Sequence, residues 1–132
     1  MEPKKKCVLA VDDTPSYLML LNMILQKQYA VKAVPKGETA LKIARQDPAA
    51  VDLILLDIMM DGMDGFAVCQ ELKADPATAQ IPVIFISGKE DRAEQEKGLA
   101  LGAADFLLKP FAAEAVLAAV AKHLPTEPVL HQ

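Results

Sequence analysis

The sequence of 132 residues contains little cysteine, with Cys7 and Cys69 as its two residues of that type. Two cysteines that lie far apart and form no CxxC motif are too few for a disulfide framework or a structural zinc site. A domain of this length buries about two-thirds of the surface that its unfolded chain exposes, so it does not need such cross-links. We therefore expect two reduced thiols in a reducing compartment, with the cytoplasm as the expected location.

The chain also lacks an excess of positive charge. It has 14 lysine and arginine residues against 18 aspartate and glutamate residues, which gives a formal net charge of −4. Proteins that bind nucleic acid through its phosphate backbone carry basic surfaces. Direct binding of nucleic acid is therefore not expected.

Long hydrophobic runs are absent as well. The apolar stretch at residues 51–60 is interrupted by acids and is far shorter than the roughly 20 residues that cross a bilayer. Lysines at residues 4–6 resemble the start of a signal peptide, but the apolar run that follows them ends at Asp12. We therefore expect neither a membrane helix nor a membrane partner.

The sequence does contain a fivefold alternation of short apolar runs with longer amphipathic runs. This alternation predicts parallel strands joined by right-handed helical crossovers, with helices on both faces of the sheet. We therefore predict a doubly wound, flavodoxin-like α/β fold, (βα)5, with the five-stranded order 2-1-3-4-5. Strands are expected at residues 6–11, 30–34, 52–56, 82–86 and 105–108. Helices are expected from Pro15, with Thr14 as its cap, and at about 37–45, 66–73, 90–101 and 111–124.

This pattern predicts one domain over residues 5–124, followed by a short C-terminal tail or the start of a linker at residues 125–132. No internal repeat or low-complexity tract divides it. The tail is too short to fold alone, so any output is expected in another chain or in a segment beyond it.

Four of the five predicted strands end in polar side chains. Asp12 and Asp13 follow the first strand, Asp57 the third, Ser87 the fourth and Lys109 the fifth. In a sheet of this order, the second strand lies at an edge, and the strand order reverses between the first and third strands. The three carboxylates are therefore expected to converge at that point.

Converging carboxylates repel one another, so they either acquire raised pKa values or bind a cation. Oxygen ligands with positions left for water suit Mg²⁺. Lys109 adds a positive charge and Ser87 a hydroxyl donor. This set suits phosphoryl transfer onto a carboxylate, which needs charge neutralisation, an in-line nucleophile and donors for the equatorial oxygens.

Four motifs, in this order and at these intervals, resemble the receiver domains of two-component response regulators of the chemotaxis-regulator type. The resemblance covers about residues 5–124. The motifs are Val11-Asp12-Asp13, then Leu55-Leu56-Asp57 followed by Met60 and Met63-Asp64-Gly65, then Phe85-Ile86-Ser87-Gly88, and finally Gly102-Ala103-Ala104-Asp105-Phe106 with Lys109-Pro110-Phe111.

The resemblance implies that Asp57 is the phosphoacceptor and that a histidine kinase or phosphotransfer protein is the phosphodonor. It also implies that Asp12, Asp13 and Asp57 hold Mg²⁺, with the backbone carbonyl of Met59 as a further ligand. The domain would then be no enzyme beyond promoting its own phosphorylation and dephosphorylation.

The resemblance also implies that Ser87 and Lys109 contact the phosphoryl group and that Ser87 and Phe106 form the switch. The bond between Lys109 and Pro110 is expected to be cis. The phosphorylated domain would present helix 4, strand 5 and helix 5 to a downstream effector, an output domain or a second copy as a homodimer.

Two features depart from the family pattern. Asp61 stands where the family commonly has proline four residues after the phosphoacceptor, which adds an acid near the metal and leaves the loop less rigid. Met59 and Lys89 occupy positions that in this family line the path of the attacking water. The rate of dephosphorylation should therefore differ from that of the chemotaxis prototype.

Several alternatives stay open from the sequence. Singly, each acid could be a helix cap or loop residue, Ser87 a cap, Lys109 a surface side chain and Phe106 a core residue. A haloacid-dehalogenase-type phosphatase would need an Asp-x-Asp motif where this chain has Asp12-Asp13, and a flavin-binding module would need a phosphate loop without acids. Within the receiver family, residues 75–85 resemble receivers that precede domains for cyclic-dinucleotide synthesis or hydrolysis.

The last predicted helix is unusually apolar. Between residues 111 and 121 its single charged residue is Glu114. A surface helix normally has one polar face, so this helix either contacts a partner or a second copy, or is an ordinary alanine-rich helix.

Overall fold

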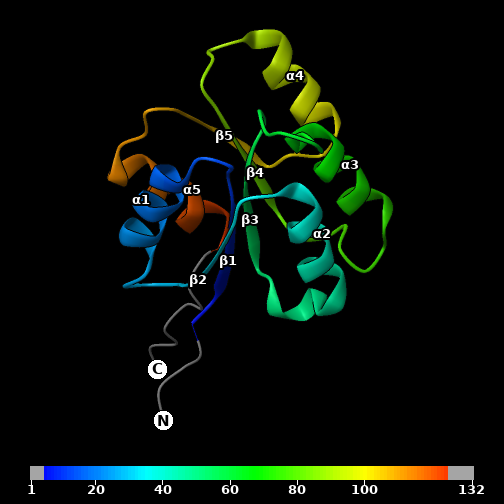
Figure 1. The fold of residues 1–132 in the computed structure, drawn as a ribbon, viewed down its shortest axis with the longest axis horizontal. Coiled ribbons are helices and arrows are strands. Elements are labelled where there is room, and N and C mark those ends of the chain that lie inside the picture. The colour runs from blue at the N-terminus through cyan, green and yellow to red at the C-terminus, as the bar shows by residue number, and fades with distance from the viewer. Residues whose placement is uncertain (1–4, 125–132) are drawn as a thin grey trace, which may run out of the picture.

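The computed structural model describes residues 5–124 and contains one sheet of five parallel strands (Figure 1). The order in the sheet is β2-β1-β3-β4-β5, which confirms the predicted fold and strand order. The tail predicted at residues 125–132 lies outside the described residues. The strands are β1 (Cys7–Val11), β2 (Ala30–Val34), β3 (Leu53–Asp57), β4 (Val83–Ser87) and β5 (Asp105–Leu108).

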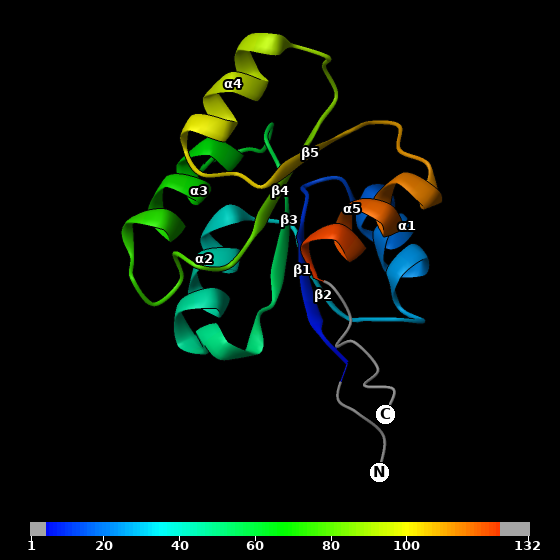
Figure 2. The same ribbon diagram turned by 180° about the vertical axis from the view of Figure 1, so that it is seen from behind.

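The described residues form five α-helices. Figures 1 and 2 show that the helices cover both faces of the sheet. Helices α1 (Pro15–Leu25) and α5 (Ala113–His123) lie on one face. Helices α2 (Gly37–Gln46), α3 (Gly65–Ala74) and α4 (Arg92–Ala100) lie on the other, and a short 3₁₀ helix, η1 (Pro48–Ala50), leads into β3. Within residues 5–124, none of the helices combines the length and the apolar character needed to cross a membrane.

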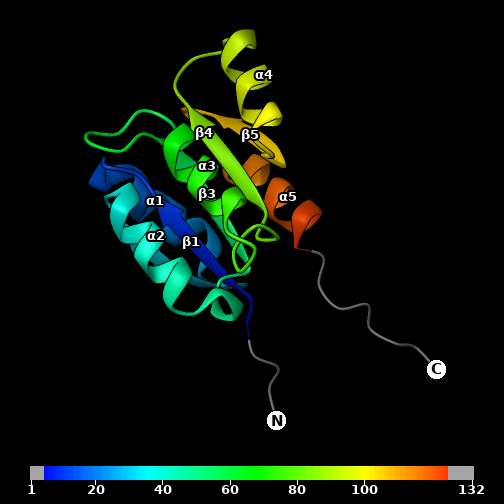
Figure 3. The ribbon, with the colours of Figure 1, turned by 90° about the vertical axis from the view of Figure 1, so that its right-hand side faces the viewer.

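The three central strands are covered on both faces, which explains their continuous apolar sequences. Every residue of β1, β3 and β4 is buried, and Figure 3 shows these strands side by side. Alternate side chains enter two separate cores. Leu9 and Phe85 pack in the core under α2 and α3, whereas Val8 and Ile84 pack in the core under α1 and α5.

Helix α4 is held against the sheet by close approach rather than by a large apolar face. Its one buried residue is Gly98. A Cβ atom at Gly98 would overlap the ring of Phe106 and would lie 2.9 Å from Cδ2 of Phe85. The glycine therefore lets the helix backbone reach the aromatic rings of β4 and β5.

The helices begin within two residues of the predicted positions, with α4 starting at Arg92 and α5 at Ala113, but the expected cap of α1 is wrong in one respect. Thr14 lies at the N-cap and Pro15 in the first turn, yet the Thr14 side chain makes no capping hydrogen bond. The Asp12 carboxylate serves this turn instead, because its Oδ1 accepts the Thr14 backbone N–H at 2.9 Å. Asp64 and Asp91 do cap α3 and α4 through their side chains.

A glycine at the start of α3 is required by the loop that follows β3. A Cβ atom at Gly65 would overlap the carbonyl oxygen of Asp57 and would lie 2.9 Å from Cα of Ile58. We expect Gly65→Ala to lower the free energy of unfolding by about 1–3 kcal/mol, because backbone atoms must shift. Gly88→Ala is the matched control, since no atom lies within 4 Å of a Cβ there. Equal urea midpoints for the two variants would contradict this prediction.

Candidate functional site

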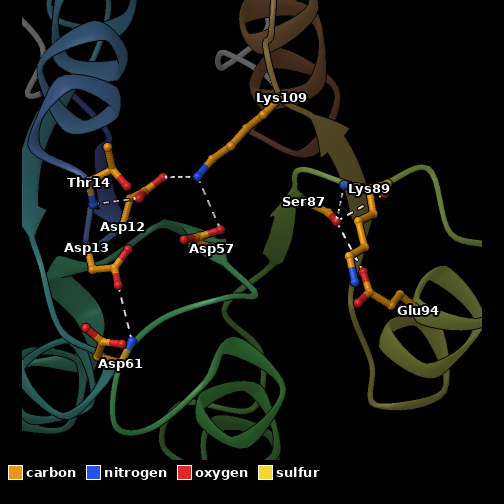
Figure 4. A network of polar contacts seen from close by, with 9 residues as sticks. All are labelled: Asp12, Asp13, Thr14, Asp57, Asp61, Ser87, Lys89, Glu94 and Lys109. Carbon is orange, nitrogen blue, oxygen red and sulfur yellow. Dashed lines mark hydrogen bonds and ion pairs between the residues drawn. The ribbon is translucent and has the colours of Figure 1, made fainter.

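The carboxyl ends of four strands bring the predicted site residues to one edge of the sheet (Figure 4). Asp12 and Asp13 directly follow β1, and Asp57 and Ser87 are the last residues of β3 and β4. Lys109 directly follows β5, and its bond to Pro110 is cis, as expected. Strand β2 contributes none of these residues, which agrees with its position at the edge of the sheet.

Three carboxylates meet at this edge. Asp12, Asp13 and Asp57 each place one carboxylate oxygen within 4.8 Å of the others. Asp12 and Asp57 are buried, with 0% and 2% of their surface exposed, whereas Asp13 is partly exposed. The cluster can therefore be reached by solvent from the side of Asp13.

Lys109 is the positive charge that faces the buried pair of carboxylates. Its Nζ lies 2.9 Å from Asp12 Oδ2 and 3.4 Å from Asp57 Oδ1. The same ammonium lies 4.1 Å from the centre of the Tyr17 ring on α1. Burial alone would lower the pKa of Lys109, but the two carboxylates favour its charged form and raise that pKa overall.

Asp57 has a higher pKa than an ordinary aspartate. Burial raises its pKa from 3.8 to about 6, and repulsion from Asp12 acts in the same direction. Lys109 opposes this shift but does not cancel it. The Asp57 carboxylate is therefore ionised at neutral pH, yet its charge is poorly compensated by the protein alone.

The loop after β3 is tied to the cluster through its backbone. The Asp61 N–H donates to Asp13 Oδ2 at 3.2 Å. The Asp61 side chain itself is exposed, and the Met59 side chain is 63% exposed. This loop therefore contacts the cluster through a main-chain N–H that a proline at position 61 would lack.

Ser87 lies apart from the carboxylates in a second polar group (Figure 4). Its Oγ lies 3.1 Å from the carbonyl oxygen of Lys89 and 3.2 Å from Oε1 of Glu94 on α4. It also accepts the Lys89 backbone N–H at 3.1 Å. The structure thus places Ser87 at the predicted edge, with its hydroxyl engaged by the β4–α4 loop and by α4.

Phe106 lies on β5, between the site and α4. Its ring centre is 5.5 Å from that of Phe85, and the ring packs against Gly98. Phe106 is partly buried against the core under α2 and α3.

Two contacts of the site were not found from the sequence. Tyr17 beneath Lys109 has no sequence signal, because the two residues are far apart in the chain. Glu94 stands three residues after the cap Asp91, which is the spacing of a capping box. That pattern predicts a contact with the start of its own helix and not the contact with Ser87 that the structure shows.

The donor set at this edge fits a hard divalent cation. It consists of carboxylate oxygens that approach one another closely, with space toward solvent for water ligands, as Mg²⁺ prefers. Asp12 Oδ2 is buried, and the Lys109 ammonium pairs with it at 2.9 Å. One lysine thus faces three carboxylates. A cation here would reduce the excess of negative charge.

The chain is similar to several known proteins. The solved structure of the chemotaxis response regulator CheY4 of Vibrio cholerae superposes with a TM-score of 0.84 and 27% sequence identity, covering 91% of this chain and 99% of that chain. Response regulator PleD of Caulobacter vibrioides is 46% identical over 104 residues, which are 78% of this chain and 22% of that protein.

A Vibrio cholerae protein named Probable cyclic di-GMP phosphodiesterase is 38% identical over 125 residues, which are 94% of this chain and 28% of that protein. The chain thus spans about a quarter of the length of these two curated relatives. The sequence profile described as Response regulator receiver domain matches residues 8–121. The chain therefore belongs to the family of response regulator receiver domains, which act in two-component signal transduction.

Proposed function

We propose that this receiver domain accepts a phosphoryl group on Asp57 from a histidine kinase or a phosphotransfer protein in the cytoplasm. The observation that carries the proposal is the geometry of the acidic cluster. Asp57 lies at the reversal point of the sheet with two further carboxylates, and Lys109 lies 3.4 Å from one of its oxygens. In this arrangement the Asp57 carboxylate can act as a nucleophile, and the Lys109 ammonium offsets part of its negative charge.

The proposed transfer makes one bond and breaks one bond. A carboxylate oxygen of Asp57 attacks the phosphorus of a phosphohistidine, and the bond between phosphorus and the imidazole nitrogen breaks. Lys109 stays beside the new acyl phosphate and offsets the added negative charge. Hydrolysis reverses the modification, because water attacks the phosphorus, releases inorganic phosphate and restores the Asp57 carboxylate.

The metal in this proposal is Mg²⁺, held by Asp12, Asp13, Asp57 and the backbone carbonyl of Met59. When bound, it would supply charge neutralisation between the carboxylates and the phosphoryl oxygens. The side chains of Met59 and Lys89 are both exposed, so both can line the path of the attacking water.

The proposed output surface consists of α4, β5 and α5. Leu99 on α4 and Leu108 on β5 are exposed apolar residues, at 56% and 37%. Movement of Ser87 toward a phosphorylated Asp57 would leave room for Phe106 to turn further inward, which changes this surface for an effector, an output domain or a second copy. Such a change requires that the phosphoryl group binds one of two conformations more tightly.

A longer signalling protein is a specific alternative to a domain that acts alone. The receiver regions of PleD and of the protein named Probable cyclic di-GMP phosphodiesterase are similar to this chain, and each belongs to a much longer protein. This supports a role in cyclic-dinucleotide signalling. The family membership of the chain argues against the haloacid-dehalogenase-type phosphatase.

Phosphorylation of Asp57 can be tested directly with a small phosphodonor such as acetyl phosphate in the presence of Mg²⁺. The wild type should gain one phosphoryl group by intact mass, and Asp57→Asn should gain none, because the amide is no nucleophile. Glu90→Gln is the control, since Glu90 is an exposed acid outside the cluster. Labelling of Asp57→Asn at the wild-type rate would overturn the assignment.

The raised pKa of Asp57 predicts a dependence of stability on pH. Between its usual pKa of 3.8 and its value of about 6 in the folded protein, the folded state binds more protons than the unfolded state. The free energy of unfolding of the metal-free wild type should therefore fall as the pH rises through this window. Asp57→Asn removes the free-energy cost of burying the ionised carboxylate. The variant should therefore be more stable than the wild type at neutral pH, by on the order of 1–3 kcal/mol.

Urea unfolding across this pH range, with chelator or with Mg²⁺, measures this effect. Mg²⁺ should stabilise the wild type strongly and Asp57→Asn weakly. Glu90→Gln serves as the control, because Glu90 is an exposed acid outside the cluster. An Asp57→Asn protein that is no more stable than the wild type without metal would contradict the buried, uncompensated charge.

The proposed output surface predicts self-association on phosphorylation. Light scattering should show a mass that rises with concentration after phosphorylation, and Leu108→Glu should suppress the rise because it places a charge on β5. Met19→Glu is the control, since Met19 is an exposed apolar residue on α1, outside the proposed surface. A monomeric mass at every concentration, with and without phosphorylation, would exclude the dimer.

A further inference from the structure

The Ser87 hydroxyl lies near more hydrogen-bond acceptors than it can donate to at one time. A hydroxyl group donates one hydrogen bond at a time. Both the Lys89 carbonyl oxygen, at 3.1 Å, and Glu94 Oε1, at 3.2 Å, lie within reach of this one proton. The carboxylate is the stronger acceptor, because a hydrogen bond to an ionised group is stronger than one between neutral groups.

The Glu94 side chain contacts Ser87, although its own helix offers a nearby partner, the backbone N–H of the cap residue. In the sequence Asp91-Arg92-Ala93-Glu94, Asp91 caps α4 and accepts the backbone N–H groups of Ala93 and Glu94. The side chain at this spacing usually returns to the backbone N–H of the cap residue. Within residues 5–124 the hydrogen bond of the Glu94 carboxylate instead goes to Ser87, on another element of the fold.

The two polar groups at this edge of the sheet are separate. Figure 4 shows Ser87, Lys89 and Glu94 on one side and the carboxylates with Lys109 on the other. Strands β3 and β4 are adjacent, and Asp57 is in register with Ile86, the residue before Ser87. A hydroxyl that leaves Glu94 therefore has only one strand spacing to cover before it faces Asp57.

We propose that Glu94 is a positioning residue that holds the Ser87 hydroxyl away from Asp57 in the unphosphorylated protein, and that a phosphoryl group on Asp57 competes with it for this hydroxyl. The proposal rests on the function proposed above, since it needs a phosphoryl group at Asp57. When the hydroxyl moves to the phosphoryl oxygens, Glu94 loses its partner on β4. The first turn of α4 is then held by Asp91 alone, so Glu94 links the site to α4 independently of Phe106.

The competition predicts that removal of Glu94 favours the phosphoryl-bound form. The probe is beryllofluoride with Mg²⁺, which mimics a phosphoryl group on a carboxylate, and its binding is measured by titration calorimetry. Calorimetry suits a chain that contains no tryptophan. Glu94→Ala should bind the probe about three- to tenfold more tightly than the wild type, because the hydroxyl then gives up only the weaker, neutral hydrogen bond to the Lys89 carbonyl.

A double-mutant cycle with Ser87 separates this role from a general effect of charge. Removing the negative charge of Glu94 would favour an anion in any background, whereas the proposed competition needs the hydroxyl. In Ser87→Ala, the further change Glu94→Ala should therefore leave the affinity unchanged within about twofold. Equal tightening in both backgrounds, or no tightening in either, would overturn the proposal.

Controls keep this inference distinguishable from the proposed function. Glu96→Ala removes another acid from α4 that is exposed and paired with Arg92, so it should leave the affinity unchanged. Glu94→Gln retains a neutral acceptor, so it should tighten binding of the probe less than Glu94→Ala does. This variant also tests the proposal if Glu94→Ala does not fold. Asp57→Asn must abolish binding of the probe. If Asp57→Asn still binds the probe, the proposed function fails. If binding requires Asp57 but the effects of Glu94→Ala and Ser87→Ala simply add, the role of Glu94 alone is overturned.

Discussion

The structure depends on one electrostatic constraint, which is the burial of negative charge where the strand order of the sheet reverses. Three carboxylates each place an oxygen within 4.8 Å of the others, and among residues 5–124 Lys109 is the one ammonium paired with them. Asp12 organises the start of α1, Asp13 binds the loop after β3, and Lys109 links β5 to Tyr17 on α1. The arrangement of the surrounding loops therefore follows from how this charge is held.

The same edge of the sheet carries a second polar group, in which Ser87 contacts Lys89 and Glu94. The β3–α3 junction lies against the end of β4, because the Ile58 N–H donates to the Ile86 carbonyl at 3.0 Å. A phosphoryl group at Asp57 would introduce acceptors beside β4, whose terminal hydroxyl contacts α4. Negative charge is thus concentrated at the ends of β1 and β3, and the hydroxyl proposed to respond to it lies at the end of β4.

The sequence was sufficient to predict the strand order and the residues at the strand ends, because buried strands leave continuous apolar runs and each run ends in its polar residue. It was not sufficient for contacts that depend on side-chain direction. Thr14 has the composition of a cap, yet the Asp12 carboxylate serves that turn. Glu94 has the spacing of a capping box, yet its carboxylate contacts β4. Such choices between neighbouring partners depend on tertiary packing, which periodicity does not describe.

Helix α4 buries a single residue, and that residue is a glycine with no side chain to contribute to the apolar core. Few buried apolar contacts mean a low free energy of local opening, so α4 should be among the first described elements to exchange its amide hydrogens with solvent. Its contacts with the core are made by Gly98 against the rings of Phe85 and Phe106 and by the Lys97 ammonium over the ring of Phe66. Displacing α4 therefore uncovers aromatic rings but removes no large apolar side chain of its own from a buried position, so a small change in hydrogen bonding at its first turn can shift the helix.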